Sequence, residues 1–132
     1  GEVHKGMTKE MVEETDRVNE SAPAYKLDED KIEKWYYSTN ASRVLGFDLI
    51  ISFQDSKVLD IYEPEDGIWI DMPKDVLIKA CGQPEDTKKS VGRDKVKEKW
   101  YYGGRDTRQG TTVYKWEVRL ENEVVEGWTE LE

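Results

Sequence analysis

An internal repeat is the feature that most constrains how this chain can fold. Glu33-Lys34-Trp35-Tyr36-Tyr37 recurs as Glu98-Lys99-Trp100-Tyr101-Tyr102, an identity of five residues at an offset of 65. Further positions agree at the same offset, namely Met7 with Met72, Lys9 with Lys74, Glu10 with Asp75, and Val12 with Leu77. Several matches in one register predict that a supersecondary unit is duplicated within the 132 residues.

Each copy is predicted to form one helix followed by three strands. The first helix starts after Thr8, whose hydroxyl can accept from the first free amides. The second helix starts near Asp71 or Pro73 and ends at Gly82, a residue type that favours helix C-termini. Apolar spacing places on the helix faces Met11, Val12, Thr15 and Val18 in the first copy, and Met72, Val76, Leu77, Ala80 and Cys81 in the second.

The strands follow from period-2 alternation and β-rich composition. They are expected over 35–37, 43–53 and 57–62 in the first copy, and over 99–102, 111–120 and 124–129 in the second. The residues expected to share a buried face are Leu45, Phe47, Leu49, Ile51 and Phe53, and in the second copy Tyr114, Trp116, Val118 and Leu120. The hydrophilic segments 19–34 and 83–99 are expected to be turns, a short helix or loop.

The fold class predicted from these elements is α+β. Two tandem helix-plus-three-strand repeats, residues 1–66 and 67–130, would form one antiparallel sheet with both helices packed on one face. A copy of about 65 residues buries little surface alone, so the repeats are expected to share one core. We interpret Gly1 and residues 131–132 as remnants of cloning and of an affinity tag, and leave them out of the fold reasoning.

Composition excludes several function classes. A net charge of −9, from 20 Lys+Arg and 29 Asp+Glu, disfavours general binding to nucleic acid. No apolar run approaches the roughly 18–20 residues that a membrane span needs. Five Trp, seven Tyr and two Phe provide bulk for an interior and argue against a disordered acidic tail. One cysteine rules out an internal disulfide.

The residues that could carry chemistry do not form a recognisable set. His4 is the only histidine and lies near the N-terminus, while Cys81 lies in an apolar stripe at a helix C-terminus, where a thiol is not activated. The acidic clusters 28–30 and 63–67 lack the alternate ligand spacing of a calcium loop. We therefore predict no catalytic residue, no metal and no cofactor, and a chain that is not an enzyme.

Aromatic and basic residues are the candidates for binding. Alternation places Tyr36 and Tyr101 on the sheet face opposite the neighbouring Trp35 and Trp100, where they either line an open face or fill core. Segment 88–108 carries eight basic and three acidic residues, a surplus of +5, which indicates either solvated loops or a contact with an acidic partner or anionic lipid headgroups. The candidate protein-binding residues are Tyr36, Trp69, Tyr101, Lys88, Lys89, Arg93, Arg105 and Arg108.

Some of these residues resemble a known family. Gly6-Met7-Thr8-Lys9-Glu10-Met11-Val12 is similar to the helix start of the SmpA/OmlA (BamE) family of small bacterial outer-membrane lipoproteins. Cys81-Gly82-Gln83-Pro84, followed by Trp100-Tyr101-Tyr102, resembles that family's Leu-Gly-x-Pro element and later strand. The tandem arrangement looks like that of the β-lactamase inhibitor proteins (BLIP). The first copy has no Gly-x-Pro after its helix, and the lipid-bearing Cys of the family is not in this sequence.

The resemblance implies a non-enzymatic protein-binding module of the bacterial cell envelope, periplasmic or anchored to the outer membrane by a lipid upstream of this sequence. The expected partner is a protein, bound through an aromatic sheet face. The alternative is a secreted inhibitor of an extracellular enzyme such as a hydrolase, acting through a loop tip such as Asp66-Gly67-Ile68-Trp69. The partner's identity and the oligomeric state stay open, because one fold supports several functions.

Overall fold

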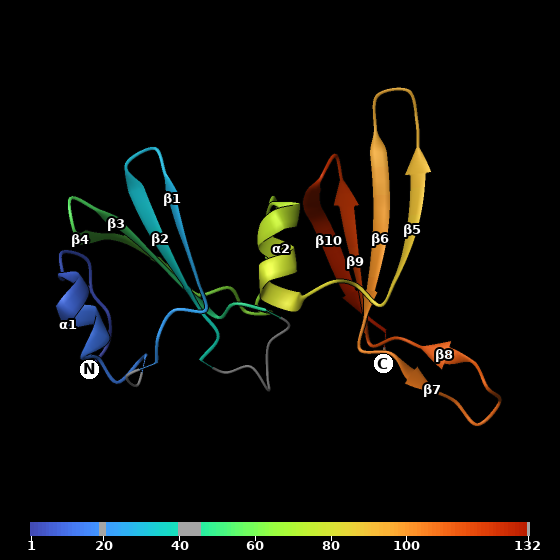
Figure 1. Ribbon diagram of the computed structural model, residues 1–132, viewed down its shortest axis with the longest axis horizontal. Helices are drawn as coiled ribbons and strands as arrows, with labels where there is room; N and C mark the ends of the chain where they lie inside the picture. The colour runs from blue at the N-terminus through green and yellow to red at the C-terminus, as the bar shows by residue number, and fades with distance from the viewer. Residues whose placement is uncertain (19–20, 40–45, 132) are drawn as a thin grey trace. The chain divides into compact units, whose positions relative to one another are not determined.

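Two short helices and ten strands make up the part of the chain that the computed structural model describes, residues 1–18, 21–39 and 46–131 (Figure 1). The chain divides into two units, Gly1–Ile68 and Trp69–Glu132, called here the first and second unit. Each unit contains one helix and one four-stranded antiparallel sheet, and the second unit adds a two-stranded ribbon.

A helix is the first element of the first unit. It starts after Thr8, whose Oγ1 accepts a hydrogen bond from the Met11 amide at 3.3 Å, and this confirms the predicted N-cap. Four strands follow and pair in sequence order. The elements of this unit are α1 (Lys9–Glu13), β1 (Tyr25–Glu29), β2 (Ile32–Tyr37), β3 (Leu49–Gln54) and β4 (Lys57–Tyr62).

The core of the first unit lies between α1 and one face of its sheet. Val12 from the helix is fully buried together with alternate residues of β2 and β3. The rings of Trp35 and Phe53 lie 4.6 Å apart at 59°, a tilted arrangement that aromatic pairs favour. The buried members of this cluster are Val3, Val12, Val18, Trp35, Tyr37, Leu49, Ile51, Phe53 and Val58.

The second unit has a longer helix, which ends as predicted at Gly82. That residue has a φ of 80°, and its amide donates to the Ile78 carbonyl at 2.8 Å. The sheet order is β10-β9-β6-β5, and β7 pairs with β8 in a separate ribbon (Figure 1). The elements are α2 (Lys74–Cys81), β5 (Asp86–Val91), β6 (Val96–Tyr102), β7 (Arg105–Asp106), β8 (Thr112–Val113), β9 (Trp116–Glu121) and β10 (Val124–Glu130).

A Lys–Glu–Trp cluster ties each helix to its sheet. In the second unit, Lys74 Nζ lies 3.2 Å from a carboxylate oxygen of Glu98 and 5.3 Å from the ring centroid of Trp100. The equivalent residues of the first unit are Lys9, Glu33 and Trp35, which make the same ion pair and a cation–π contact. A lysine in the first turn of a helix opposes the helix dipole. The carboxylate and the ring compensate for that cost and fix the start of the helix against an inner strand.

The predicted α+β architecture is wrong. The chain is mostly β, with 45% of residues in strands and 11% in helices, and its strands form three sheets rather than one. Each helix is followed by at least four strands, because β1 and β5 form within the segments expected to be loops. Both are edge strands, and all six residues of β5 are exposed. Because β5 buries no side chain, its sequence has no apolar alternation, whereas β1 has only the two half-buried residues Tyr25 and Leu27 to give a strand signal.

Other predicted elements shift in detail. The expected strand 57–62 coincides with β4, whereas the expected strand 111–120 is divided between β8 and β9. The strand expected over 43–53 begins only at Leu49, and its residues 43–45, Leu45 among them, lie outside the described residues. Asn19, at the start of the first expected loop, also lies outside them.

The β3–β4 hairpin turn supplies a first prediction. Its two central residues, Asp55 and Ser56, both have positive φ, 52° and 64°, as a two-residue type I′ turn requires. Glycine adopts this conformation without the steric cost that Ser56 bears. We expect Ser56→Gly to raise the free energy of unfolding by about 0.5 kcal/mol in urea denaturation. Gln54→Gly, at the exposed last residue of β3, should instead lower the free energy of unfolding. If both variants lowered the free energy of unfolding equally, this account of the turn would be contradicted.

Candidate functional site

The candidate site is the face of the second sheet that α2 does not cover. Residues paired across antiparallel strands lie on the same face. Lys88 pairs with Lys99, and Lys99 pairs with Arg119, so three cations from β5, β6 and β9 form one line across the sheet. Neighbouring strands are about 4.8 Å apart, which brings these charges close together. We call Lys88, Lys99 and Arg119 the basic row, and the sheet face that carries it the site face.

The position of α2 identifies the covered face. Glu98 and Trp100, which contact Lys74 of α2, alternate along β6 with Lys99 and Tyr101 and therefore point the opposite way. Glu98 and Trp100 are buried, whereas Lys99 is exposed and Tyr101 half-buried. The basic row therefore faces away from the helix.

Arg119 is held in a fixed position on the site face. Its Nη1 donates to Glu117 Oε2 at 3.1 Å and to Thr129 Oγ1 at 2.7 Å. Gly127 lies opposite Arg119 on β10, and a Cβ at that position would come within 2.7 Å of Nη2. The glycine thus leaves the space in which the guanidinium lies across β10. A guanidinium already ordered in this way loses little conformational entropy on binding.

Two tyrosines border the basic row. The rings of Tyr101 and Tyr114 lie 5.3 Å apart, and the Tyr101 hydroxyl donates to Glu117 Oε1 at 3.2 Å. Lys88 Nζ lies 5.8 Å from the Tyr101 ring centroid. Burial, and then donation to Glu117, raise the pKa of Tyr101 above its usual value. The hydroxyl is therefore a neutral donor, and its ring presents an apolar surface beside the cations.

The basic row costs the sheet stability. Like charges directly opposite one another destabilise an antiparallel pair, and Lys88 faces Lys99 across two strands. Among the residues that the structure describes, Lys99 makes no hydrogen bond or ion pair with an acidic side chain, and its other cross-strand neighbour is Arg119. Such a departure from favourable pairing is typical of positions retained for binding.

A shallow hollow lies at the β5 side of this face. Its volume is about 240 Å3, and the site-face lysines Lys88, Lys97 and Lys99 contribute to its lining. The lining residues are Lys88, Lys89, Ser90, Lys97 and Lys99. Aliphatic stems with ammonium tips suit an extended acidic chain better than an enclosed small molecule.

The aromatic candidates separate in the structure. Tyr36 is only 4% exposed and packs between Tyr25 and Phe47, with centroid distances of 5.4 and 5.1 Å, so it belongs to the interior of the first unit. Trp69 is half-buried and does not belong to the site face. Tyr101 lies on the site face beside Lys88. Tyr114, expected on the buried face with Trp116, instead packs on Tyr101.

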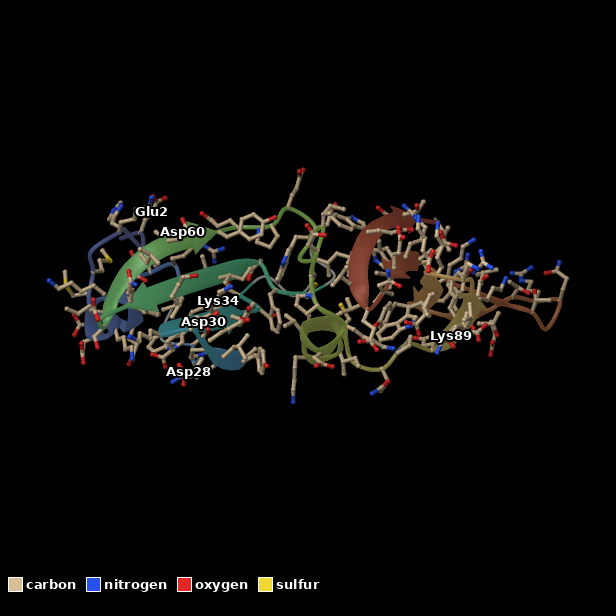
Figure 2. The ribbon with its side chains drawn as sticks, turned by 90° about the horizontal axis from the view of Figure 1, so that it is seen from above. Glu2, Asp28, Asp30, Lys34, Asp60 and Lys89 are labelled. Atoms are coloured by element: carbon tan, nitrogen blue, oxygen red, sulfur yellow. The ribbon has the colours of Figure 1, made fainter. Side chains whose placement is uncertain are left out.

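The basic candidates are also dispersed. Lys89, labelled in Figure 2, is exposed on β5 but pairs with Glu98 and so points to the covered side. Arg93 is exposed in the β5–β6 turn, Arg105 lies in β7, and Arg108 lies in the β7–β8 turn. Of the eight candidates, the structure brings together Lys88 and Tyr101. Lys99, Arg119 and Tyr114 join them, and none of these was among the candidates.

The loop expected to carry the contacts of an enzyme inhibitor has two buried residues at its centre. Ile68 is 1% exposed, and the Gly67 carbonyl accepts from the Phe47 amide at 2.8 Å. Gly67 itself is buried and has a φ of 81°. The hydrogen bond to Phe47 ties Gly67 to the first unit, whereas Asp66 and Trp69 are half-buried.

The described residues offer little for other chemistry. Within residues 1–18, 21–39 and 46–131, no group of three or more His, Cys, Asp or Glu side chains could hold a metal ion. Burial raises the pKa of the Cys81 thiol to about 12, which leaves it protonated and weakly nucleophilic. His4 is exposed. No helix in the described part of the chain has the length and apolar character needed to cross a bilayer.

Comparison with known proteins adds no relative: no family model, no curated protein and no solved structure matches this chain.

Proposed function

We propose that this chain is a non-enzymatic protein-binding module of the bacterial cell envelope, and that it binds an acidic partner through the site face. The observation that carries the proposal is the basic row, with Arg119 held by Glu117 and Thr129 and with Tyr101 and Tyr114 beside it. The envelope location comes from the resemblance of the helix start and the Gly-x-Pro element to the outer-membrane lipoprotein family.

Physical chemistry supports this surface as an interface. Tyrosine and arginine are enriched among the residues that dominate binding energy, because they bury large areas at low entropic cost. An acidic partner would relieve the repulsion between Lys88 and Lys99, which the free protein bears. The net charge of −9 would repel an acidic partner at long range. The basic row therefore has to orient the partner once the two proteins are close.

A photo-cross-linking experiment in the source cells tests the proposal. A benzophenone amino acid replaces Ser90, an exposed and uncharged residue of the site face, and in a control it replaces Lys79 of α2. We expect a discrete adduct from position 90, recovered in the envelope fraction, and none of the same mass from position 79. Adding Lys99→Glu should reduce the adduct at least about tenfold, because it places a carboxylate within the basic row.

Two outcomes would contradict the proposal. The first is an adduct of equal yield from positions 90 and 79, which would indicate contact without a specific face. The second is a yield from position 90 that Lys99→Glu leaves unchanged. Recovery of the adduct outside the envelope fraction would contradict the envelope location alone.

A further inference from the structure

Strand β5 forms an open edge of the second sheet. It is the last strand in the order β10-β9-β6-β5, and all six of its residues are exposed. Its pairing with β6 runs without a register shift from Asp86 to Val91. Apart from the ladder with β6, no backbone–backbone hydrogen bond within the described part of the chain involves residues 86–91. The outer side of β5 therefore presents free backbone groups.

The free groups can be assigned to particular residues. The Gly92 amide donates to the Lys95 carbonyl at 2.7 Å, so Gly92 points inward to the β6 side. In an antiparallel ladder the inward and outward amides alternate, which makes Thr87, Lys89 and Val91 the residues whose N–H and C=O groups point outward. The Thr87 amide confirms this direction, because it bonds to the Asp86 side chain at 2.9 Å instead of to β6.

This edge has few of the usual protections against strand addition. Proteins protect edges with bulges, prolines or charged side chains. The other edge strand, β10, has a bulge between Val125 and Gly127, whereas β5 has neither bulge nor proline. Its protection comes from Lys88 and Lys89, whose charge repels a basic strand, would lose hydration against a neutral one, and attracts an acidic one.

We propose that β5 accepts an acidic extended segment of the partner protein as an added fifth strand. This inference rests on the proposed function and names the form that the partner takes at the site face. The added strand would bond to the outward N–H and C=O groups of Lys89 and Val91 and to the Thr87 carbonyl, since the Thr87 amide already donates to Asp86. A carboxylate opposite Lys88 would lie in line with the basic row, on the added strand, and would neutralise part of its positive charge.

The charges along β5 also predict the sequence of that segment. Lys88 and Ser90 point to the site face, with Lys97 behind Ser90, and Lys89 points to the other face. Carboxylates opposite positions 88 and 89 would therefore each meet a lysine, and one opposite Ser90 would lie on the same face as Lys97, one strand further away. Asp86 disfavours a carboxylate at the far end of the strand. The fitting segment has three successive acidic residues and a neutral residue opposite Asp86.

A synthetic peptide tests the inference directly. The probe is the capped heptapeptide Thr-Val-Glu-Glu-Glu-Val-Thr, and the control replaces its three glutamates with lysines. We expect the acidic peptide to bind in calorimetry and to slow hydrogen exchange of the Lys89 and Val91 amides by at least about tenfold at saturation. The lysine peptide should do neither.

Two matched changes separate strand pairing from charge. Lys89→Pro removes an outward amide and leaves the inward ladder donors in place, which edge strands tolerate, and Lys89→Gln removes the charge alone. We expect Lys89→Pro to abolish binding and Lys89→Gln to weaken it only severalfold. A peptide with the central glutamate N-methylated keeps its charge but lacks that amide donor, and it should bind at least about tenfold more weakly even if the proline variant fails to fold.

Binding without protection of Lys89 and Val91, or binding that N-methylation leaves unchanged, would overturn strand addition. Equal binding of an eight-nucleotide oligo-dT would do the same, because it would show recognition of negative charge alone. If peptide binding still depends on Lys99 in these cases, the site face keeps its proposed function and only the strand mode fails. A missing adduct at position 90 in cells would instead count against the proposed function, whatever the peptide does.

Discussion

Phe53→Ala is expected to lower the free energy of unfolding of the first unit by about 4 kcal/mol. Phe53 is 1% exposed and lies at the centre of the cluster that Val12, Trp35 and Val58 share. Removing its ring takes away the tilted contact with Trp35 at 4.6 Å and leaves a cavity that the hydrogen-bonded strands around it cannot close. The measurement is native-state hydrogen exchange of the β2 and β3 amides, which reports on the first unit alone.

Leu59 provides the matched control for this prediction. It lies in β4 of the same sheet but is 42% exposed, next to the irregularity in pairing between β3 and β4. Leu59→Ala should cost less than about 1 kcal/mol. Similar losses for the two variants would contradict the position of the core between α1 and the inner face of the first sheet.

The second large effect is expected at the Lys–Glu–Trp cluster of the second unit. Glu98→Ala leaves the Lys74 ammonium without its carboxylate and removes the acceptor that lies 3.4 Å from Trp100 Nε1. The Glu98 side chain is 10% exposed and that of Lys74 is 28% exposed, so the pair is shielded from water on one side only. We expect a loss of about 2 kcal/mol, below the range for fully buried pairs whose partner is removed.

A double-mutant cycle isolates this interaction. Glu98→Ala and Lys74→Met are combined, and urea denaturation of the four proteins is expected to give a coupling energy of about 1 kcal/mol or more. The ion pair between Lys95 and Glu121, whose side chains are 64% and 27% exposed, serves as the comparison and should show less than about 0.5 kcal/mol. Equal couplings for the two pairs would mean that the cluster does not fix α2 to the sheet.

Local signals in the sequence predicted the elements that they govern directly. The repeated Glu-Lys-Trp-Tyr-Tyr segments lie within β2 and β6, each an inner strand of its sheet. Thr8 begins α1 and Gly82 ends α2, because capping depends on residues within one turn of the helix end. The prediction of a single continuous sheet was wrong. The number of sheets depends on which distant strands pair, and the alternation of residues within a strand does not encode that pairing.

The candidate site could be predicted only in part for the same reason. Tyr101 and Lys88 were recognised from the repeat and from the local surplus of positive charge. Their alignment with Lys99 and Arg119 depends on the register of β5, β6 and β9. Gly127 was the one further feature of the sequence that could have indicated this site. A glycine inside a strand often marks a place where another group comes close to the backbone, and at Gly127 that group is the Arg119 guanidinium.

Mass spectrometry of the partner peptide cross-linked to position 90 would decide whether the basic row holds an acidic segment. We expect one peptide with at least three successive Asp or Glu residues, obtained from position 90 and lost with Lys99→Glu. A basic or neutral peptide, or the same peptide from position 79 on α2, would contradict the claim that the basic row of the second sheet holds an acidic partner.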